Sequence, residues 1–520
     1  MNRDGYFNVL VAEDEQIILE DVIEKLEKTG KRFKVIASAM NGEDALQLVE
    51  QLKPDVLVTD IKMPVMDGLE LIKKASSVQP GIEVVIISGF NEFSYAQQAI
   101  KLGVTDYLLK PLRMEALLET MQSIENKLMH KLRLTERDII IQDINGIKTT
   151  GALPSSLKNS SFMLYLLCLG NLYDHTADAL DPMQFHQLWN TVEWAGLIDS
   201  CFNPGIRWWV VDEKIQNKKF LIAAWEKQAD MPEPGTAAKV GAVLAAALNG
   251  MMPVTVCSDE TGLVFQEIWE TARNLRKVLK ANLVPCRSSV IRPGDIKPPH
   301  TGSEYDDLLA MGAIERSIRQ NRLDLLNSEL KSIFSQWKNA GYSQVQLEKL
   351  LIHLVRGILK QLGCLEDGVL SAAEMEICII IAVTNDIDML FNDVLQLLGN
   401  YIYPQKKAGD SSEELVLKLE EDIRANLANP INVAYLAEKF NFNPSYIIRV
   451  FKKYKGEPPM QYLISLRINE AKRLIGNNQD LDFKSISEVV GYTDPHYFSR
   501  VFKNMTGMSP SEYRESIKDT

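Results

Sequence analysis

The sequence predicts a multidomain fold, with a doubly wound α/β domain at the N-terminus, a mixed α/β and helical central region, and an all-α domain at the C-terminus. Three observations support this class. At 520 residues the chain is too long for a single hydrophobic core. Between Asn8 and Met129, short β-branched runs alternate with amphipathic helical stretches, which is typical of a parallel sheet wrapped by helices. The C-terminal part contains an internal repeat, which indicates two equivalent structural units.

Five strands fit the N-terminal pattern, and a helix follows them from about Arg113. That helix has an apolar seam with a/d-like spacing, which is compatible with pairing to a second copy or with ordinary core packing. The seam consists of Leu117, Met121, Ile124 and Leu128. The predicted strands are Val9 to Ala12, Lys34 to Ala39, Val56 to Thr59, Val84 to Ser88, and Tyr107 to Leu109.

The central region gives weaker signals. Strands are predicted at Phe162 to Leu169, Trp208 to Val211 and Val254 to Cys257, and helical periodicity dominates from Glu304 to Leu398. Its strand and helix order resembles degenerate nucleotide-cyclase domains, but it has no Gly-Gly-Asp/Glu-Glu-Phe signature and no P-loop, so we expect a spacer and dimerisation unit without enzymatic activity. Linkers are predicted at Ile291 to Ser303 and Lys406 to Ser412. The predicted domains are therefore residues 1–127, 128–300, 301–405 and 412–520.

Composition limits the classes of function. The net charge of −12 argues against nucleic-acid binding on average, but the charge is uneven along the chain. Residues 1–127 carry 14 basic and 21 acidic side chains, whereas residues 431–520 carry 13 basic and 10 acidic ones. Six scattered cysteines indicate packing residues, not a zinc site or a disulfide framework. Met1 to Asn8 lack the apolar core of a signal peptide, so we expect a cytoplasmic protein with no membrane partner.

Three carboxylates fall at the carboxyl ends of the predicted N-terminal strands, where doubly wound sheets bind ligands. Glu13 and Asp14 follow the first strand, and Asp60 ends the third. Because like charges in one pocket repel, a hard divalent cation with oxygen ligands is expected, and Mg²⁺ is the natural choice. A carboxylate beside Mg²⁺ can attack phosphorus, and Ser88 and Lys110 are placed to bind phosphoryl oxygens.

In this order, these residues resemble the receiver domain of two-component systems, which has a flavodoxin-like fold. The resemblance rests on Glu13-Asp14, Asp60 to Pro64, Met66-Asp67-Gly68, Ser88-Gly89 and Tyr107 to Pro111. It implies that Asp60 is the phosphoacceptor and that Asp14, Asp60 and the main-chain carbonyl of Lys62 ligate Mg²⁺, with Glu13 in support. It also implies that Ser88, Tyr107 and Lys110 relay phosphorylation, and that the Lys110-Pro111 bond is cis.

The C-terminal repeat places matching residues 51 positions apart, as from Pro444 to Pro495. Each unit opens a helix with a cap residue and a proline, Asn443-Pro444 and Asp494-Pro495. A shorter helix and a tight turn precede each, at Val433 to Phe440 and Lys484 to Gly491, so each unit is predicted to be a helix-turn-helix. The buried stripes are predicted at Ile447, Val450, Phe451 and Tyr454, and at Phe498, Val501, Phe502 and Met505.

The opposite faces of the two second helices are the predicted DNA-reading surface. Arginine suits guanine edges and lysine suits phosphates. Ile448 is unusual there, and either contacts a thymine methyl group or is partly buried. The predicted DNA-binding residues are Ser445, Ile448, Arg449, Lys452 and Lys453 in the first unit, and His496, Ser499, Arg500 and Lys503 in the second, with Lys455 also placed for a phosphate.

The stretch from Gly491 to Lys503, with the trailing Gly507, Ser509-Pro510 and Tyr513-Arg514, resembles the AraC/XylS family of transcription regulators. That resemblance implies two helix-turn-helix units joined by a long helix near Met460 to Ile475. A receiver joined to this domain resembles the YesN-like response regulators. The implied partners are a sensor histidine kinase, a double-stranded promoter operator, a second copy of the phosphorylated chain and, as a further candidate, RNA polymerase. The alternative is a small-molecule-sensing AraC-type regulator with an inert receiver.

Overall fold

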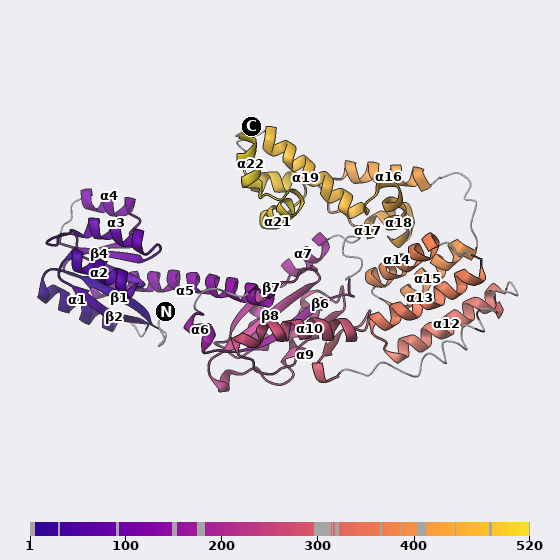
Figure 1. The fold of residues 1–520 in the computed structure, drawn as a ribbon, viewed down its shortest axis with the longest axis horizontal. Helices are drawn as coiled ribbons and strands as arrows, with labels where there is room; N and C mark the ends of the chain where they lie inside the picture. Colours follow the sequence, from indigo (N-terminus) through magenta and orange to yellow (C-terminus); the bar gives the residue numbers. More distant parts are fainter. Residues whose placement is uncertain are drawn as a thin grey trace. The chain divides into compact units, whose positions relative to one another are not determined.

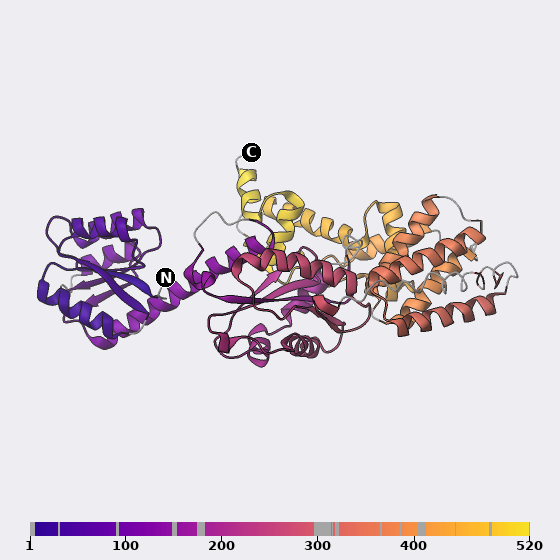
Figure 2. The same cartoon turned by 60° about the horizontal axis from the view of Figure 1, so that its bottom comes forward.

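The structure is a computed structural model, shown in two views in Figures 1 and 2. It describes residues 6–29, 32–89, 93–147, 153–173, 182–295, 312, 314, 316–317, 322–363, 367–384, 386–402, 412–442, 444–477 and 481–518. The chain divides into two compact units, Met1–Phe162 with Leu263–Trp269, and Met163–Gly262 with Glu270–Thr520.

The first unit contains a five-stranded parallel sheet in the order β2-β1-β3-β4-β5. Helices alternate with the strands, so the predicted doubly wound class is confirmed (Figure 1). The strands are β1 (Phe7–Ala12), β2 (Phe33–Ala39), β3 (Val56–Thr59), β4 (Glu83–Ser88) and β5 (Asp106–Leu109), and the first four helices are α1 (Gln16–Lys28), α2 (Gly42–Leu52), α3 (Gly68–Val78) and α4 (Phe93–Lys101).

The central strands of this sheet are buried on both faces. Successive β3 side chains alternate between two hydrophobic clusters: Val56 and Val58 join one, and Leu57 joins the other. In a strand, successive side chains point to opposite faces of the sheet, and here helices cover both faces. Both sets of side chains must therefore be apolar, which explains why these strands are continuous β-branched runs without polar positions.

The last helix of the receiver-like part, α5 (Met114–Ile144), is 31 residues long. The four predicted seam residues are buried, and all four lie in the core cluster of the sheet. The same helix continues beyond residue 127 and buries Ile140 and Ile144 as well. The Ser156 hydroxyl donates to Glu136 of this helix (2.5 Å), so the short helix that contains Ser156 contacts α5.

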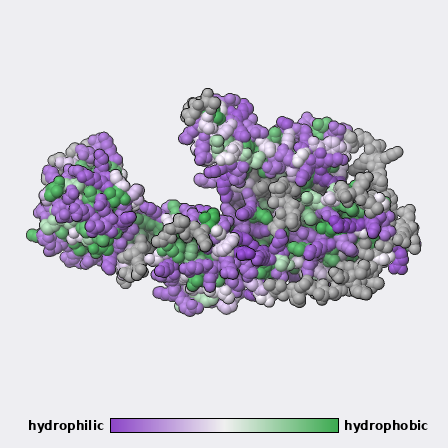
Figure 3. All heavy atoms as spheres, in the orientation of Figure 1, coloured by the Kyte–Doolittle hydropathy of each residue, from purple (hydrophilic) through white to green (hydrophobic). Residues whose placement is uncertain are grey.

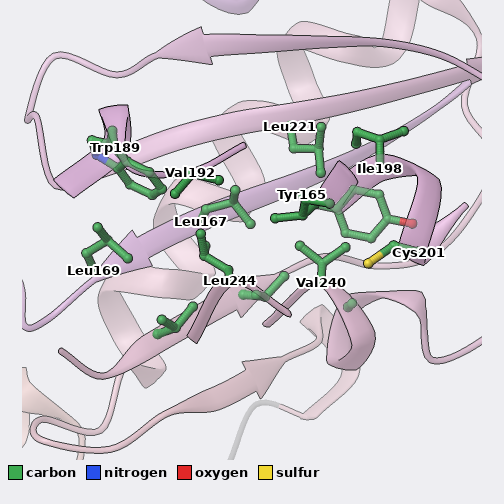
Figure 4. Packing of buried hydrophobic residues seen from close by; sticks show 14 of the residues in the cluster. Tyr165, Leu167, Leu169, Trp189, Val192, Ile198, Cys201, Leu221, Val240 and Leu244 are labelled. Atoms are coloured by element: carbon green, nitrogen blue, oxygen red, sulfur yellow. The ribbon is translucent and has the colours of Figure 1, made fainter. Parts of the chain in front are cut away.

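The second unit begins with a mixed sheet in the order β10-β9-β6-β8-β7. Strand β6 (Ser161–Leu169) is its centre, and apolar side chains of β6 and β8 meet those of the helices in one core (Figure 4). Three of these strands were predicted, whereas β8 and β10 were not. The remaining elements are β7 (Arg207–Asp212), β8 (Lys218–Trp225), β9 (Val254–Cys257), β10 (Ser289–Ile291), α7 (Pro182–Asn190), α8 (Trp194–Cys201), α9 (Thr236–Ala247) and α10 (Ile268–Asn282).

Four further helices, α12 (Leu323–Ala340), α13 (Gln344–Gln361), α14 (Asp367–Val383) and α15 (Ile387–Ile402), share one hydrophobic cluster. Buried polar side chains join them to the mixed sheet. The Asn171 side chain donates to the carbonyls of Ile381 (2.7 Å) and Thr384 (2.6 Å) at the end of α14. Gln344 exchanges hydrogen bonds with the backbone of Leu172. Because these groups are buried, they fix the relative position of the sheet and the helices.

The C-terminal part is all-α, as predicted, and the surface shown in Figure 3 is predominantly hydrophilic there. It has one hydrophobic cluster for each repeat. Two predicted stripe positions are wrong: Tyr454 is 42% exposed and Met505 is 41% exposed, because each lies in the last turn of its helix. The helices are α16 (Ser412–Ala425), α17 (Val433–Phe440), α18 (Pro444–Lys455), α19 (Pro459–Asn477), α20 (Phe483–Val489), α21 (Pro495–Thr506) and α22 (Pro510–Lys518).

The hydropathy of the helices and the state of the cysteines bear on the expectations drawn from composition. Within the described residues, no helix is long and apolar enough to cross a membrane. The five described cysteines are free thiols, three of them buried, which agrees with a packing role, and Cys364 lies outside the described residues. The predicted linkers at Ile291 to Ser303 and Lys406 to Ser412 also fall largely outside them.

The tight loop after β3 gives a stability prediction. At Gly68 an added Cβ would lie 2.0 Å from the carbonyl oxygen of Asp60, so Gly68→Ala must displace the backbone. We expect the substitution to destabilise the first unit by about 1 to 3 kcal/mol. Urea unfolding monitored by hydrogen exchange of β1 and β3 measures this. The matched control is Gly89→Ala, where a Cβ meets nothing within 4 Å, and equal stability of the two variants would contradict the prediction.

Candidate functional site

An acidic cluster lies at the carboxyl ends of β1 and β3. These neighbouring strands pair in parallel, with Ala12 opposite Thr59, so Glu13 and Asp60 emerge side by side. One carboxylate oxygen from each of Glu13, Asp14 and Asp60 lies within 4.8 Å of the others. Glu13 and Asp60 are buried and Asp14 is half-buried, so the pocket concentrates negative charge away from water.

Lys110 neutralises part of this charge. It follows β5, and its Nζ lies 2.7 Å from Asp60 Oδ2 and 2.8 Å from Glu13 Oε2. Its backbone N–H donates to the Ser88 carbonyl (2.9 Å), and the Lys110-Pro111 peptide is cis, as expected. Burial alone would lower the pKa of Lys110, but the bonds to Asp60 and Glu13 outweigh it and raise the pKa. The ammonium group is therefore firmly charged.

The pocket still holds more negative charge than one lysine balances. Burial raises the pKa of Glu13, and the nearby Asp60 adds to the effect against the opposing influence of Lys110. Three clustered oxygen ligands, with an unfavourable local charge, are the donor set that Mg²⁺ prefers. The residues present therefore fit the divalent cation predicted from the sequence.

The loop from Asp60 to Gly68 is held close to the pocket. The Ile61 N–H donates to Asp60 Oδ1 (2.5 Å), and the Gly68 N–H donates to the Ile61 carbonyl (2.8 Å). Val65 adopts a φ of 70°, which is rare for a β-branched residue and marks a strained turn. Lys62, the predicted carbonyl ligand, lies in this loop and its side chain is exposed.

Ser88 and Tyr107 lie on the two strands at the edge of this pocket. Ser88 is fully buried at the end of β4, and Tyr107 is half-buried on β5 and packs against the second core cluster. The structure thus brings Glu13, Asp14, Asp60 and Lys110 into one pocket. It places Ser88 at the end of β4, and Tyr107 within β5, opposite Ile86 of β4.

The second site is formed by the two helix-turn-helix units. In the first, Asn432 caps α17 by accepting from the Tyr435 N–H (2.7 Å). In the second, Asp494 caps α21 by accepting from the His496 N–H (2.8 Å). The turn of the second helix-turn-helix needs glycine, because Gly491 has a φ of 86° and an added Cβ would lie 2.8 Å from the Ala428 carbonyl oxygen.

A residue that the sequence analysis did not single out joins the two helix-turn-helix units. Arg467 of α19 is only 2% exposed. Its guanidinium donates to the carbonyls of Leu427 and Asn429, at 2.8 Å each, and stacks over the Tyr492 ring at 5.4 Å. Arg467 therefore holds the loop before the first helix-turn-helix against the turn of the second helix-turn-helix. Its position in the middle of a long amphipathic helix gave no signal of this role.

The predicted DNA-binding residues divide by exposure. Ser499 and Arg449 are half-buried, and Ile448 is 1% exposed within the first repeat's core, so its predicted outward orientation is wrong in this structure. Lys455 pairs with Glu420. The hydrogen bonds from Lys455 and Tyr462 lower the pKa of the Glu420 carboxyl to about 2. The side chain of Ser445 and all of Asn443 lie outside the described residues. The exposed residues are Lys452, Lys453, His496, Arg500 and Lys503.

Comparisons with known proteins match the two parts of the chain that contain these residues. The family model of the response regulator receiver domain matches residues 9–122, and that of a helix-turn-helix domain matches residues 436–516. The chain is thus a response regulator with an AraC-type helix-turn-helix domain, a class of transcription regulators.

Over nearly its whole length it is similar to the uncharacterized transcriptional regulatory protein YesN of Bacillus subtilis, with 25% identity over 98% of this chain and 97% of that protein. It is 29% identical to the transcriptional regulatory protein DegU of Brevibacillus brevis over 27% of this chain and 62% of that protein. A solved structure of the REC domain of AraT, a response regulator from Geobacillus stearothermophilus, is 41% identical, covers 24% of this chain and 98% of its own, and has a TM-score of 0.23.

The charge balance of the acidic pocket can be tested through stability. Lys110→Met removes the ammonium group and leaves two buried carboxylates unpaired, so we expect the first unit to lose about 3 kcal/mol of unfolding free energy without a divalent cation. Added MgCl₂ should reduce the deficit, because a bound cation replaces the lost charge.

Urea unfolding with hydrogen exchange of β1 and β3 measures both effects. The control is Lys73→Met, which removes an exposed lysine of α3. Equal stability of the two variants would contradict the expected role of Lys110, as would a Lys110→Met deficit that magnesium leaves unchanged.

Proposed function

We propose that this protein is a DNA-binding transcription regulator controlled by phosphorylation of Asp60. The observation that carries the proposal is the pocket in which three carboxylates and Lys110 converge at one edge of a parallel sheet. A structural salt bridge needs only one carboxylate for one lysine, whereas phosphoryl transfer needs a nucleophilic carboxylate, a cation site and a fixed positive charge together. The matches to a receiver domain and a helix-turn-helix domain support the same reading.

In the proposed reaction an Asp60 carboxylate oxygen forms a bond to phosphorus as the bond to the histidine nitrogen of a sensor kinase breaks. Asp14, Asp60 and the Lys62 carbonyl would hold Mg²⁺, with Glu13 in support, and the bound cation would neutralise charge on the transferring phosphoryl group. Lys110 is placed to pair with a phosphoryl oxygen, since its ammonium already contacts Asp60.

Ser88 and Tyr107 would carry the change outward. In the proposal the Ser88 hydroxyl pairs with the phosphoryl group and its loop closes, which allows Tyr107 to turn inward and alters the adjoining surface. This population shift would change domain packing or favour a homodimer, and so change promoter binding by the two helix-turn-helix units. The proposed partners are the kinase, the promoter operator and RNA polymerase. The proposed location is therefore the cytoplasm, where a promoter and RNA polymerase are found.

The phosphoacceptor assignment has a direct test. We expect the wild-type chain to gain one phosphoryl group from acetyl phosphate and Mg²⁺, and Asp60→Asn to gain none, because the amide is a poor nucleophile. Intact-protein mass spectrometry measures this, with Asp21→Asn, an exposed carboxylate of α1, as the control. Phosphate uptake by Asp60→Asn would reassign the acceptor. No uptake by the wild type would favour a small-molecule-sensing regulator with an inert receiver.

The DNA-reading assignment can be tested by comparing two exposed cations of α21. We expect Arg500→Ala to cost about 1 to 3 kcal/mol at one base position and to relax specificity there. Lys503→Ala should instead weaken binding on all sequences about equally and reduce the salt slope by about one. In-vitro selection of duplexes, followed by anisotropy titrations at several salt concentrations, separates the two effects. Uniform weakening by Arg500→Ala would make it a phosphate contact.

A further inference from the structure

The two arginines assigned to base reading are already paired with carboxylates of the chain itself. In the second repeat, Arg500 Nη1 lies 2.9 Å from Asp212 Oδ2, at the end of β7. In the first repeat, Arg449 Nη1 lies 3.1 Å from Glu376 Oε2, on α14. Both contacts lie within the second unit. The Arg500 Nη1 group that donates to Asp212 cannot donate to guanine at the same time, and the Arg449 guanidinium is held by its charge beside the buried Glu376 carboxylate.

Further contacts surround each pair. At the start of α21 the Nε2 of His186, on α7, lies 3.0 Å from Asp494 Oδ2, and its ring stacks on Tyr497 with centroids 4.3 Å apart. At α18, Ile448 packs in one cluster with Ile379 of α14. The DNA-facing side of each repeat is therefore contacted by different elements of the central region, α14 in the first repeat and β7 with α7 in the second.

The charges on both sides of the contact suit this arrangement. Burial alone would raise the pKa of Asp212, but Lys219 and Arg500 outweigh it and lower the pKa. Glu376 is only 3% exposed beside Arg449. Negative charges on the DNA-facing side also repel phosphates. Lys452, Lys453 and Lys503 remain exposed, so weak, salt-dependent attraction to DNA persists while base reading is blocked.

We propose that this is a closed state, in which Glu376 and Asp212 take the places of DNA groups on Arg449 and Arg500 and thereby exclude the operator. The inference rests on the proposed DNA-binding function and names its intramolecular competitor. The central region would then be an inhibitor of base reading in addition to a connector. Opening requires that both pairs break, because each repeat is held by its own carboxylate.

The test uses the full-length chain with Asp212→Asn and Glu376→Gln, singly and together. The probe is a duplex recovered by wild-type protein from a random library, and affinity is measured by anisotropy at fixed salt without a phosphodonor. If nine in ten molecules are closed, full opening raises the apparent affinity about tenfold. Asp199→Asn is the matched control, because it removes the same charge from an exposed position of α8.

A second measurement needs no DNA. The His186 side chain is only 13% exposed in the closed state, so hydroxyl-radical footprinting should show protection in the wild type and in Asp199→Asn. In the double variant its oxidation should approach that of the exposed His496, which serves as the internal reference. His186→Ala, which removes the stack on Tyr497 but no charge, should also bind the duplex more tightly.

The outcomes separate the two proposals. If the double variant binds the duplex no better than Asp199→Asn and His186 stays protected, or if His186 is already exposed in the wild type, the closed state is refuted while the DNA-binding function stands. If no duplex is recovered by the wild type or by the double variant, the proposed function fails, and footprinting still decides whether the carboxylates hold the contact.

Discussion

The ion pairs of Lys110 with Asp60 and Glu13 are the interaction on which the arrangement of the acidic pocket depends. These ion pairs join the end of β5 to the ends of β1 and β3, so a change in the charge of the acidic pocket acts directly on the residue that follows the edge strand β5. A phosphoryl group on Asp60 would add negative charge beside that lysine and draw it into a new pairing. The residues after Lys110 lead directly into α5, which is one continuous helix as far as Ile144. A displacement at β5 would therefore act on the first part of α5, whose Leu117, Met121 and Ile124 pack in the core cluster of the same sheet.

The central region was predicted as a spacer, and its internal contacts indicate a stiffer role. Asn171 binds the last turn of α14 from one side, while Glu376 and Ile379 on the same helix contact α18. Helix α14 is thus clamped between the mixed sheet and the first helix-turn-helix unit. Because buried amide hydrogen bonds are costly to break without replacement, sheet and helix should move together. A movement of the sheet can in this way change what the DNA-reading arginines contact, without a flexible linker in the path.

The sequence predicted best what local patterns determine. The bounds of β3, β9 and α17 agree with the expectation because β-branched runs and capping residues mark them directly. The pocket was predictable because the carboxyl ends of parallel strands must meet at one edge. Strand β8 was missed because a short apolar run does not distinguish a strand from a buried helix. For Ile448 the sequence left burial and a thymine contact as alternatives, and its contact with α14 decides for burial. The role of Arg467 was not predictable, since it depends on the loop before α17, which is distant in the sequence.

The two contacts that close the DNA-reading surface differ in strength, and this difference sets an order of opening. Arg500 and Asp212 are about half exposed, at 54% and 47%, and an ion pair of that kind contributes about 1 kcal/mol or less. Arg449 is 28% exposed and Glu376 only 3%, and the adjoining Ile448 is buried as well, so separation there exposes apolar surface and leaves a buried carboxylate unpaired. The second repeat should therefore release transiently without a signal, whereas the first should release only when α14 moves. In the proposed closed state, release of the second repeat alone would free only one of the two predicted reading helices. Full affinity then depends on the repeat that the central region holds more firmly, which places control of DNA binding at α14.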